Sequence, residues 1–142
     1  MENTYIKSKR ILASLMIIML LAYLIVPIAS ARASYYISAY SAGITAGSNG
    51  NITVSFSITG TGTMTEIGST RIEIHENGRH VGTFVHTSTP TMMGSNKALH
   101  GSTVTYKGVA GRSYYAIVTY KSANSTGWDN RALQTTTITA KN

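Results

Sequence analysis

The chain has 142 residues, no cysteine and a formal net charge of +7, and 12% of its residues are charged. The lack of cysteine excludes disulfides, a cysteine nucleophile and a lipid anchor through a cysteine. The length allows one ordinary domain and a targeting segment.

The first 33 residues have the three-part pattern of a secretory signal peptide. A short basic head precedes the apolar run Ile11–Ile25, and Pro27 and several small residues follow. The triplets Ala-Ser-Ala and Ala-Arg-Ala, which end at Ala31 and Ala33, both fit the small-x-small pattern that signal peptidase reads. We therefore predict cleavage after Ala31 or after Ala33, and an extracellular product that can stay associated with the cell surface.

The alternative is that segment 1–33 remains as a membrane anchor. A spanning helix needs about 20 apolar residues, and the apolar run here is shorter, with no basic cluster after it. We therefore expect a signal peptide at 1–33 and a single domain at 34–142. Contact with a membrane is then expected only through the signal segment before cleavage.

The charge of the expected mature part is smaller than that of the whole chain. Eight Lys or Arg and four Asp or Glu lie in 34–142, which gives 8 − 4 = +4. These charges are scattered, and no basic run is present, so a nucleic-acid partner is not expected. A mild positive charge favours anionic surfaces such as a cell wall.

Composition and alternation predict that 34–142 is all-β. Ser, Thr, Gly, Tyr, Val and Ile dominate, which are strand formers and turn residues. Ile52, Val54, Phe56 and Ile58 alternate with Ser and Thr, as in a half-buried strand. The expected strands cover residues 35–45, 51–59, 70–76, 79–87, 102–107, 113–122 and 132–140. Seven strands predict an antiparallel β-sandwich of the immunoglobulin or fibronectin type III kind, with a partly open barrel as the alternative.

The stretch "HENGRH" predicts the tip of a β-hairpin. Asn77 and Gly78 tolerate the positive φ that a two-residue type I′ turn requires. This turn pairs His75 with His80 and Glu76 with the arginine that follows the glycine, as an expected ion pair. An unbroken register then assigns residues to faces. The expected core residues are Ile72, Ile74, Val81 and Val85, and the expected outer residues are Arg71, Glu73, His75, His80, Phe84 and His86.

His75 and His80 are candidate metal ligands, because cross-strand neighbours lie about 5 Å apart at Cβ. A zinc site needs three or four ligands; Glu73 could be a third, and His86 lies farther along the strand. A solvated hairpin explains the same pattern. We therefore expect no metal and no cofactor.

Catalysis is not expected either. The four carboxylates of 34–142 are Glu66, Glu73, Glu76 and Asp129. Glu73 and Glu76 point to opposite faces of one strand, and the other two lie in different predicted loops, so no pair is set across a cleft. No GxSxG nucleophile elbow occurs.

Candidate contact residues lie in two predicted loops. Met92 and Met93 follow a proline in a long connection, and Trp128 lies near the end of the chain. Exposed loop methionines and tryptophans are adaptable contact groups. The alternatives are that a methionine fills the edge of the core and that Trp128 packs over an open end of the sandwich. The expected partner of such contact residues is an extracellular protein or a wall glycan.

The C-terminal third is similar to the end of a fibronectin type III domain. Gly111 precedes Tyr114 by three residues, and apolar residues then follow at every second position before an Asn-Gly loop and a Thr-rich strand. The resemblance implies that Tyr114 is the tyrosine-corner residue, with its hydroxyl bonded to the preceding loop, and that Tyr115 is its rival. Trp128 departs from that pattern, since the core tryptophan of such domains lies on an earlier strand.

Residues 34–142 also resemble a small family of secreted Gram-positive bacterial proteins of unknown function. The shared features are a signal peptide and the segments "SFSITGTGTMTEIG", "TMMGSNK" and "GRSYYAIVTY". This resemblance implies secretion and a sandwich, and no activity. We therefore predict a secreted, non-enzymatic binding or interaction module. The alternatives are a small metal-dependent or hydrolytic module that uses His75 and His80, and a membrane-tethered structural protein.

Overall fold

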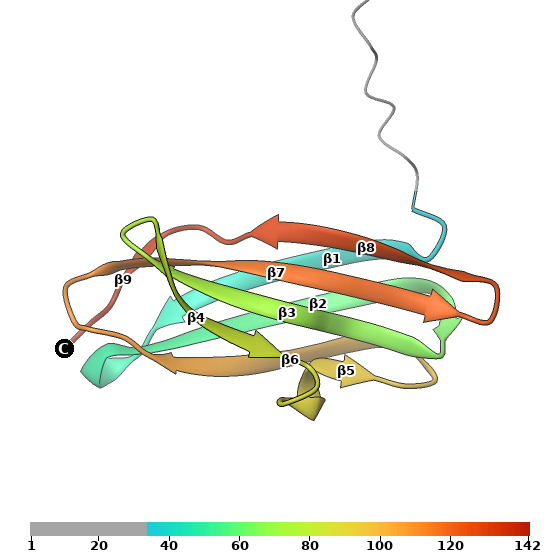
Figure 1. Cartoon of the computed structure of the whole chain (residues 1–142), viewed down its shortest axis with the longest axis horizontal. Coiled ribbons are helices and arrows are strands. Elements are labelled where there is room, and N and C mark those ends of the chain that lie inside the picture. Colours follow the sequence, from blue (N-terminus) through green and yellow to red (C-terminus); the bar gives the residue numbers. More distant parts are fainter. Residues whose placement is uncertain (1–33) are drawn as a thin grey trace, which may run out of the picture. The chain divides into compact units, whose positions relative to one another are not determined.

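The computed structural model describes residues 34–142 (Figure 1). The predicted signal peptide, and with it both candidate cleavage residues, Ala31 and Ala33, lies outside the described residues. Between Ser34 and Asn142, no helix has the length and apolar character needed to cross a membrane.

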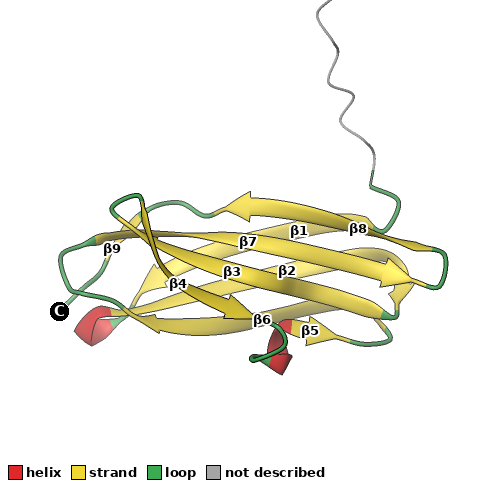
Figure 2. Cartoon of the chain, in the orientation of Figure 1, coloured by secondary structure: helices red, strands yellow, loops and turns green. Residues whose placement is uncertain are grey.

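Residues 34–142 form strands joined by short loops, with two single 3-10 turns (Figure 2). In chain order the elements are β1 (Ile37–Ala46), η1 (Ser48–Gly50), β2 (Asn51–Met64), β3 (Glu66–Glu76), β4 (Arg79–Val85), η2 (Pro90–Met92), β5 (Met93–Gly94), β6 (Lys97–Lys107), β7 (Ser113–Asn124), β8 (Gly127–Gln134) and β9 (Ile138–Thr139). The all-β prediction is confirmed, but nine strands are present where seven were expected. β5 and β9 have two residues each.

Two antiparallel sheets make up the domain. One has the order β1-β2-β6, and the other has the order β4-β3-β7-β8, with β5 paired to β3 and β9 to β7. The sheets lie face to face (Figure 1), and the buried apolar side chains lie between them. They do not close into a barrel, so the alternative fold is not the one that residues 34–142 adopt.

The core is built from alternating side chains of both sheets. Tyr114, Ala116, Val118 and Tyr120 of β7 are all fully buried. They pack in one cluster with the buried side chains of β2, which are Ile52, Val54, Phe56, Ile58 and Met64. The Tyr120 hydroxyl donates a 2.6 Å hydrogen bond to the carbonyl oxygen of Ser41 on β1. This bond ties the second sheet to the first through a polar atom that burial would otherwise leave unpaired.

The predicted loop at residues 60–69 is mostly strand. Two of its three glycines, Gly60 and Gly68, lie where another group packs closely, whereas Gly62 has open space around it. A Cβ on Gly60 would lie 2.7 Å from Cγ of Met64, and a Cβ on Gly68 would lie 2.2 Å from the carbonyl oxygen of Met92. Glycine in a strand marks such close approaches as well as bends. β2 continues to Met64, and β3 already begins at Glu66.

The last long strand begins earlier than predicted. Asn124 Oδ1 accepts hydrogen bonds from the amides of Thr126 (2.9 Å) and Gly127 (3.2 Å), which closes a tight turn after β7. β8 starts directly after it, at Gly127. Trp128 is consequently a strand residue and not a loop residue.

The β3–β4 hairpin has the predicted turn but not the predicted register throughout. Asn77 and Gly78 have φ of 49° and 84°, and His75 pairs with His80 as expected. The register then shifts between His75 and Ile74, so Ile74 pairs with Gly82 and Ile72 with Phe84. Val81 is the extra residue of a β-bulge.

The bulge reverses the predicted faces of two side chains. Phe84 packs against the core, although an unbroken register placed it outside, and Val85 pairs with Arg71 on the outer face. Packing explains the shift, since a Cβ on Gly82 would lie 2.9 Å from Cε2 of Tyr106. The bulge places Gly82, which has no side chain, under the Tyr106 ring, and it turns Phe84 toward the core. Val81 still contacts the core, as predicted.

Candidate functional site

The outer faces of the two sheets differ in chemistry, and we name them for it. The hydroxyl face is the outer face of β1-β2-β6, and the mixed face is the outer face of β4-β3-β7-β8. The residues of each follow from strand register, because alternate residues of a strand point to opposite sides of its sheet. Both faces are far more polar than the core between them.

The hydroxyl face consists mostly of small uncharged residues in register across three strands. One row is Thr45, Thr53 and Thr105, and the next is Gly43, Ser55 and Thr103. The third row is Ser41, Ser57 and Gly101. The last row, Ala39, Thr59 and Leu99, adds a leucine that is 59% exposed. These rows contain no ring and no charge, and Lys107, paired with Asn51, lies at one end.

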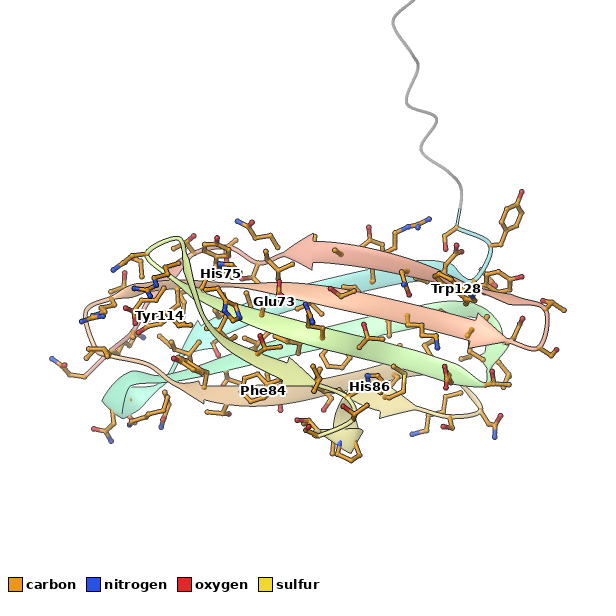
Figure 3. The ribbon with its side chains drawn as sticks, viewed as in Figure 1. Glu73, His75, Phe84, His86, Tyr114 and Trp128 are labelled. Carbon is orange, nitrogen blue, oxygen red and sulfur yellow. The ribbon has the colours of Figure 1, made fainter. Side chains whose placement is uncertain are left out.

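The mixed face carries ionic, apolar and amide side chains in rows of four. One row, from β4 to β8, is Thr83, Glu73, Ile117 and Gln134. The neighbouring row is Val85, Arg71, Thr119 and Ala132. Glu73, His75, His86 and Trp128 are labelled in Figure 3, where they spread along the length of this sheet. Charged, aromatic and amide side chains from four strands thus share one surface.

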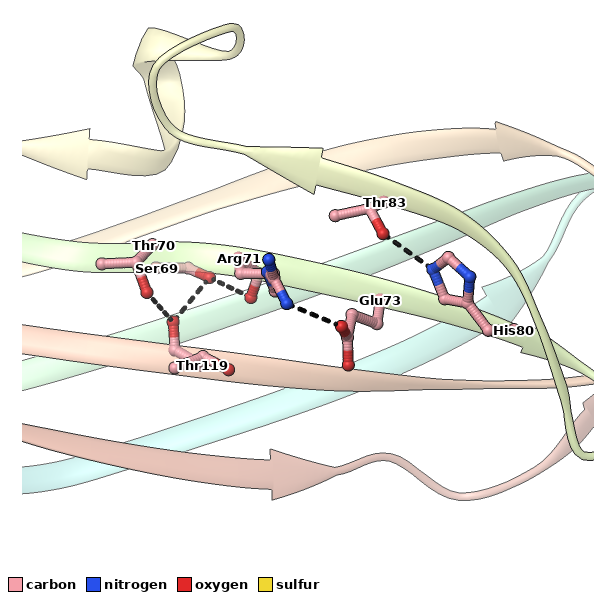
Figure 4. A network of polar contacts seen from close by, with 7 residues as sticks. All are labelled: Ser69, Thr70, Arg71, Glu73, His80, Thr83 and Thr119. Carbon is pink, nitrogen blue, oxygen red and sulfur yellow. Dashed lines mark hydrogen bonds and ion pairs between the residues drawn. The ribbon is translucent and has the colours of Figure 1, made fainter.

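Three rings gather at the hairpin end of the mixed face. The His75 imidazole stacks on Tyr115, with ring centroids 4.8 Å apart and planes 9° apart. His80 meets His75 edge-on, with centroids 5.6 Å apart. Both ring nitrogens of His75 are buried and have no hydrogen-bond partner within residues 34–142. Nε2 of His80 shares a 2.7 Å hydrogen bond with the Thr83 hydroxyl (Figure 4).

This arrangement does not present two imidazoles to a metal. The nitrogens of His75 are covered, and one nitrogen of His80 is engaged by Thr83. In the part of the chain that the structure describes, no three or more His, Cys, Asp or Glu are placed to hold a metal ion. His86, the other histidine considered as a ligand, shares a 3.2 Å hydrogen bond through Nδ1 with the carbonyl oxygen of Thr70.

A bulge in β3 positions Arg71 on the mixed face. The β3–β7 register shifts between Ser69 and Arg71. The buried Ser69 hydroxyl donates to the carbonyl oxygens of Arg71 and Thr119, both at 3.0 Å (Figure 4). The Arg71 guanidinium then lies 3.0 Å from a carboxylate oxygen of Glu73. The sequence offers no signal for this bulge, so its residues were not predicted as part of a site.

Ion pairs occupy the carboxylates on both faces of β3. Glu66 pairs with Lys121, and the hydrogen bond from that ammonium lowers the pKa of Glu66. Glu76 pairs with Arg112, and not with the expected Arg79 of the hairpin turn. The hydrogen bond from the Tyr114 hydroxyl, together with Arg112, lowers the pKa of Glu76. These groups are held as anions.

Asp129 on β8 is also held as an anion. Its Oδ2 accepts a 2.7 Å hydrogen bond from the Ser34 hydroxyl and a 3.0 Å bond from the Tyr36 amide. The hydroxyl bond from Ser34 is the main cause of a lowered pKa for Asp129, and the amides of Tyr36 and Tyr35 add to it. The carboxylate of Asp129 is thus engaged by the segment at the start of the described residues.

The predicted contact residues fall in different places. Met92 is fully buried, so of its two interpretations the one in which a methionine fills the edge of the core applies, and Met92 is not a contact residue. Its carbonyl oxygen lies against Gly68, and its side chain fills the core below η2. Met93 is half-buried and pairs with Gly68 in β5. Trp128 is 61% exposed and lies beside Ala123 at the far end of the mixed face (Figure 3). It does not pack over an open end of the domain.

Tyr114 and Tyr115 take separate roles. Tyr114 is buried, and its hydroxyl accepts a 2.9 Å hydrogen bond from the amide of Val109, in the loop before β7. Tyr115 points the other way and joins the ring cluster of the mixed face.

Comparisons of the chain with models of protein families, with curated proteins and with solved structures find no match. Its function is therefore inferred from the chemistry of the two faces.

Proposed function

We propose that residues 34–142 form a secreted, non-enzymatic binding module whose mixed face contacts a polymeric glycan of the cell wall. The observation that supports this most is the separation of chemistry between the faces. Three of the four histidines, the exposed Trp128 and the Arg71–Glu73 and Lys121–Glu66 pairs belong to the β4-β3-β7-β8 side. The opposite face offers mainly small hydroxyls and glycines, with the exposed Leu99 in its last row and Lys107 at its other end.

A glycan suits the mixed face better than a protein does. Protein interfaces have an apolar, charge-poor centre, but the central rows here contain Arg71 and Glu73 beside Ile117. A polyhydroxylated chain takes hydrogen bonds from such ions and amides, and packs its apolar ring faces on exposed aromatic rings. The net charge of +4 also favours the anionic polymers of a wall.

The state of the carboxylates supports a binding role over catalysis. A hydrolytic general acid needs a raised pKa, whereas the pKa values of Glu66, Glu76 and Asp129 are all lowered by hydrogen bonds. Each is also occupied by a partner from another strand or loop. These groups contribute structure and surface charge.

An immunoglobulin-like or fibronectin type III-like assignment fits the same proposal. Two antiparallel sheets face each other, and the Tyr114 hydroxyl bonds to the loop before its strand, as in the tyrosine corner of these domains. Secretion is supported by the signal-peptide pattern in residues 1–33. An outer location would bring the domain to its glycan partner.

The test is retention of the secreted protein on insoluble Gram-positive cell walls. We compare wild type with Trp128→Ala and Tyr115→Ala on the mixed face, and with Thr103→Ala on the hydroxyl face as the matched control. The proposal expects weaker retention for both mixed-face variants, about tenfold or more for the loss of a stacking ring, and unchanged retention for the control.

Two outcomes would count against the proposal. If wild type is not retained on walls from which proteins have been stripped, a glycan is not the partner. If Thr103→Ala reduces retention as much as Trp128→Ala, the mixed face is not the binding face. Loss of retention only after protein stripping would instead indicate a protein partner.

A further inference from the structure

The first described residues are held by the carboxylate of Asp129. Oδ2 of Asp129 accepts hydrogen bonds from the Ser34 hydroxyl at 2.7 Å and from the Tyr36 amide at 3.0 Å. The same Ser34 hydroxyl oxygen accepts a 2.9 Å hydrogen bond from the amide of Ile37, at the start of β1. The Ser34 hydroxyl therefore makes two hydrogen bonds, one as a donor to Asp129 and one as an acceptor from Ile37.

Further bonds hold this segment against both sheets. The Ser122 hydroxyl of β7 donates to the carbonyl oxygen of Tyr36 at 2.7 Å. The amide and hydroxyl of Thr61 on β2 donate to the carbonyl oxygens of Tyr36 and Tyr35, at 3.3 and 2.8 Å. The Tyr36 ring lies against Gly127, where an added Cβ would be 2.5 Å from the ring hydroxyl. Residues 34–36 are thus part of the packed domain.

Asp129 is placed to receive a cation at this point. Its carboxylate is ionised, and the charge of Arg131 adds to the hydrogen bonds in lowering its pKa. The backbone nitrogen of Ser34 belongs to the same residue as the hydroxyl that touches Oδ2. Covalent geometry therefore keeps that nitrogen within about 6 Å of the carboxylate. In the intact chain the nitrogen is a neutral amide.

We infer that the chain is cleaved between Ala33 and Ser34, and that Asp129 is the receptor for the new α-ammonium group of Ser34. This inference rests on the proposed secretion. Hydrolysis there adds water across the Ala33–Ser34 peptide bond, releases residues 1–33 with a carboxylate on Ala33 and leaves an α-ammonium on Ser34. This cation then lies beside an anion, which stabilises the folded product. Cleavage after Ala31 would place the ammonium two residues earlier, up to about 7 Å of extended chain farther from the carboxylate.

The first measurement is the intact mass and N-terminal sequence of the full chain after expression in a secreting Gram-positive host. The inference predicts a secreted product that begins at Ser34. A secreted product that begins at Arg32 overturns the inference and leaves secretion intact. A chain that keeps residues 1–33, or that stays inside the cell, contradicts the proposed secretion itself.

The second measurement tests the Asp129 receptor through a cycle of four secreted proteins. The Arg32→Ser, Ala33→Gln variant blocks the second site, so cleavage after Ala31 leaves a product two residues longer with no added cation near Asp129. Asp129→Asn is made in this background and in wild type. The product that begins at Ser34 is called the Ser34-first protein. We expect Asp129→Asn to raise its unfolding equilibrium constant by a factor about threefold larger than in the product that is two residues longer.

Equal effects of Asp129→Asn in the two backgrounds would refute the receptor role, because the hydroxyl and amide bonds are common to both. If Asp129→Asn does not fold, Ser34→Ala replaces it in the same cycle. This substitution removes the hydroxyl bond and keeps the ammonium. The inference then predicts that Ser34→Ala costs less in the Ser34-first protein than in the longer one, where the hydroxyl is the nearer donor. Equal costs would contradict it.

Discussion

The buried Tyr114 hydroxyl donates a hydrogen bond to the carboxylate of Glu76, which also pairs with Arg112. It accepts a 2.9 Å bond from the Val109 amide at the same time. One hydroxyl therefore joins the end of β3 to the loop before β7. The hairpin that carries His75 and His80 is held to the domain at this point.

Replacing Tyr114 by phenylalanine removes this link while keeping the ring. The Val109 amide and the Glu76 carboxylate each lose a partner, so we expect Tyr114→Phe to lower the free energy of unfolding by about 1–3 kcal/mol. Urea unfolding followed by circular dichroism measures this loss. Tyr115→Phe is the control, since Tyr115 lies on the outer face, and a similar loss there would contradict the assignment.

The stability of the domain should fall in acid, in part through Glu76. Its folded pKa lies below its unfolded value, so the stabilisation is present above the unfolded pKa of about 4.3 and is lost as pH falls through the folded pKa. Unfolding free energies measured between about pH 6 and pH 3 should decline less steeply for Glu76→Gln than for wild type. Parallel curves would show that the carboxylate is not engaged in solution.

The bulge at Val81 can be tested by substitution of Gly82, which faces the core only if the bulge is present. Gly82→Ala places a methyl group against the Tyr106 ring, and we expect a loss of about 1–3 kcal/mol in unfolding free energy. Gly62→Ala, on an exposed part of β2 with open space around it, should change stability by less than about 0.5 kcal/mol. If both substitutions are equally mild, the predicted unbroken register is the correct one.

His75→Phe should be neutral or stabilising. The imidazole stacks on Tyr115 with both nitrogens buried and unpaired, and an unpaired buried polar group costs about 1–3 kcal/mol. A phenyl ring keeps the stacking and removes that cost. The free energy of unfolding is the readout, with His75→Ala, expected to be destabilising, as the comparison. A loss on His75→Phe as large as on His75→Ala would mean that the nitrogens have a partner in solution.

The ring cluster should also bind Zn²⁺ no better than a variant without it. His75 has no accessible nitrogen, and His80 is bound to Thr83. Calorimetric titration with Zn²⁺ is therefore expected to give the same weak response for wild type and for His75→Ala,His80→Ala. Tight binding that disappears in the double variant would restore the metal hypothesis.

Sequence patterns predicted those parts of the fold that depend on neighbours along the chain. The alternation of Ile52, Val54, Phe56 and Ile58 identified a half-buried strand, and all four are buried. Asn77 and Gly78 identified the hairpin turn, because their positive φ is a local requirement. The first pairs of the hairpin follow directly from that turn.

Tertiary packing decided what the sequence did not predict. The bulge sets Gly82 against Tyr106, which lies on β6 in the other sheet. Gly60 and Gly68 resembled turn residues but serve contacts with Met64 and Met92. No local pattern distinguishes these two uses of glycine. The mixed face could not be predicted as a unit, because it exists only once β3, β4, β7 and β8 are aligned.

The most direct test of the mixed face as the binding face is chemical-shift mapping. Amide signals of ¹⁵N-labelled secreted protein would be followed while a soluble fragment of wall glycan is added. The account predicts shifts that cluster at Tyr115, Ile117 and Trp128 and leave the amides of Thr53 and Thr103 unmoved. Shifts that cluster on β1, β2 and β6 would contradict it and assign binding to the hydroxyl face.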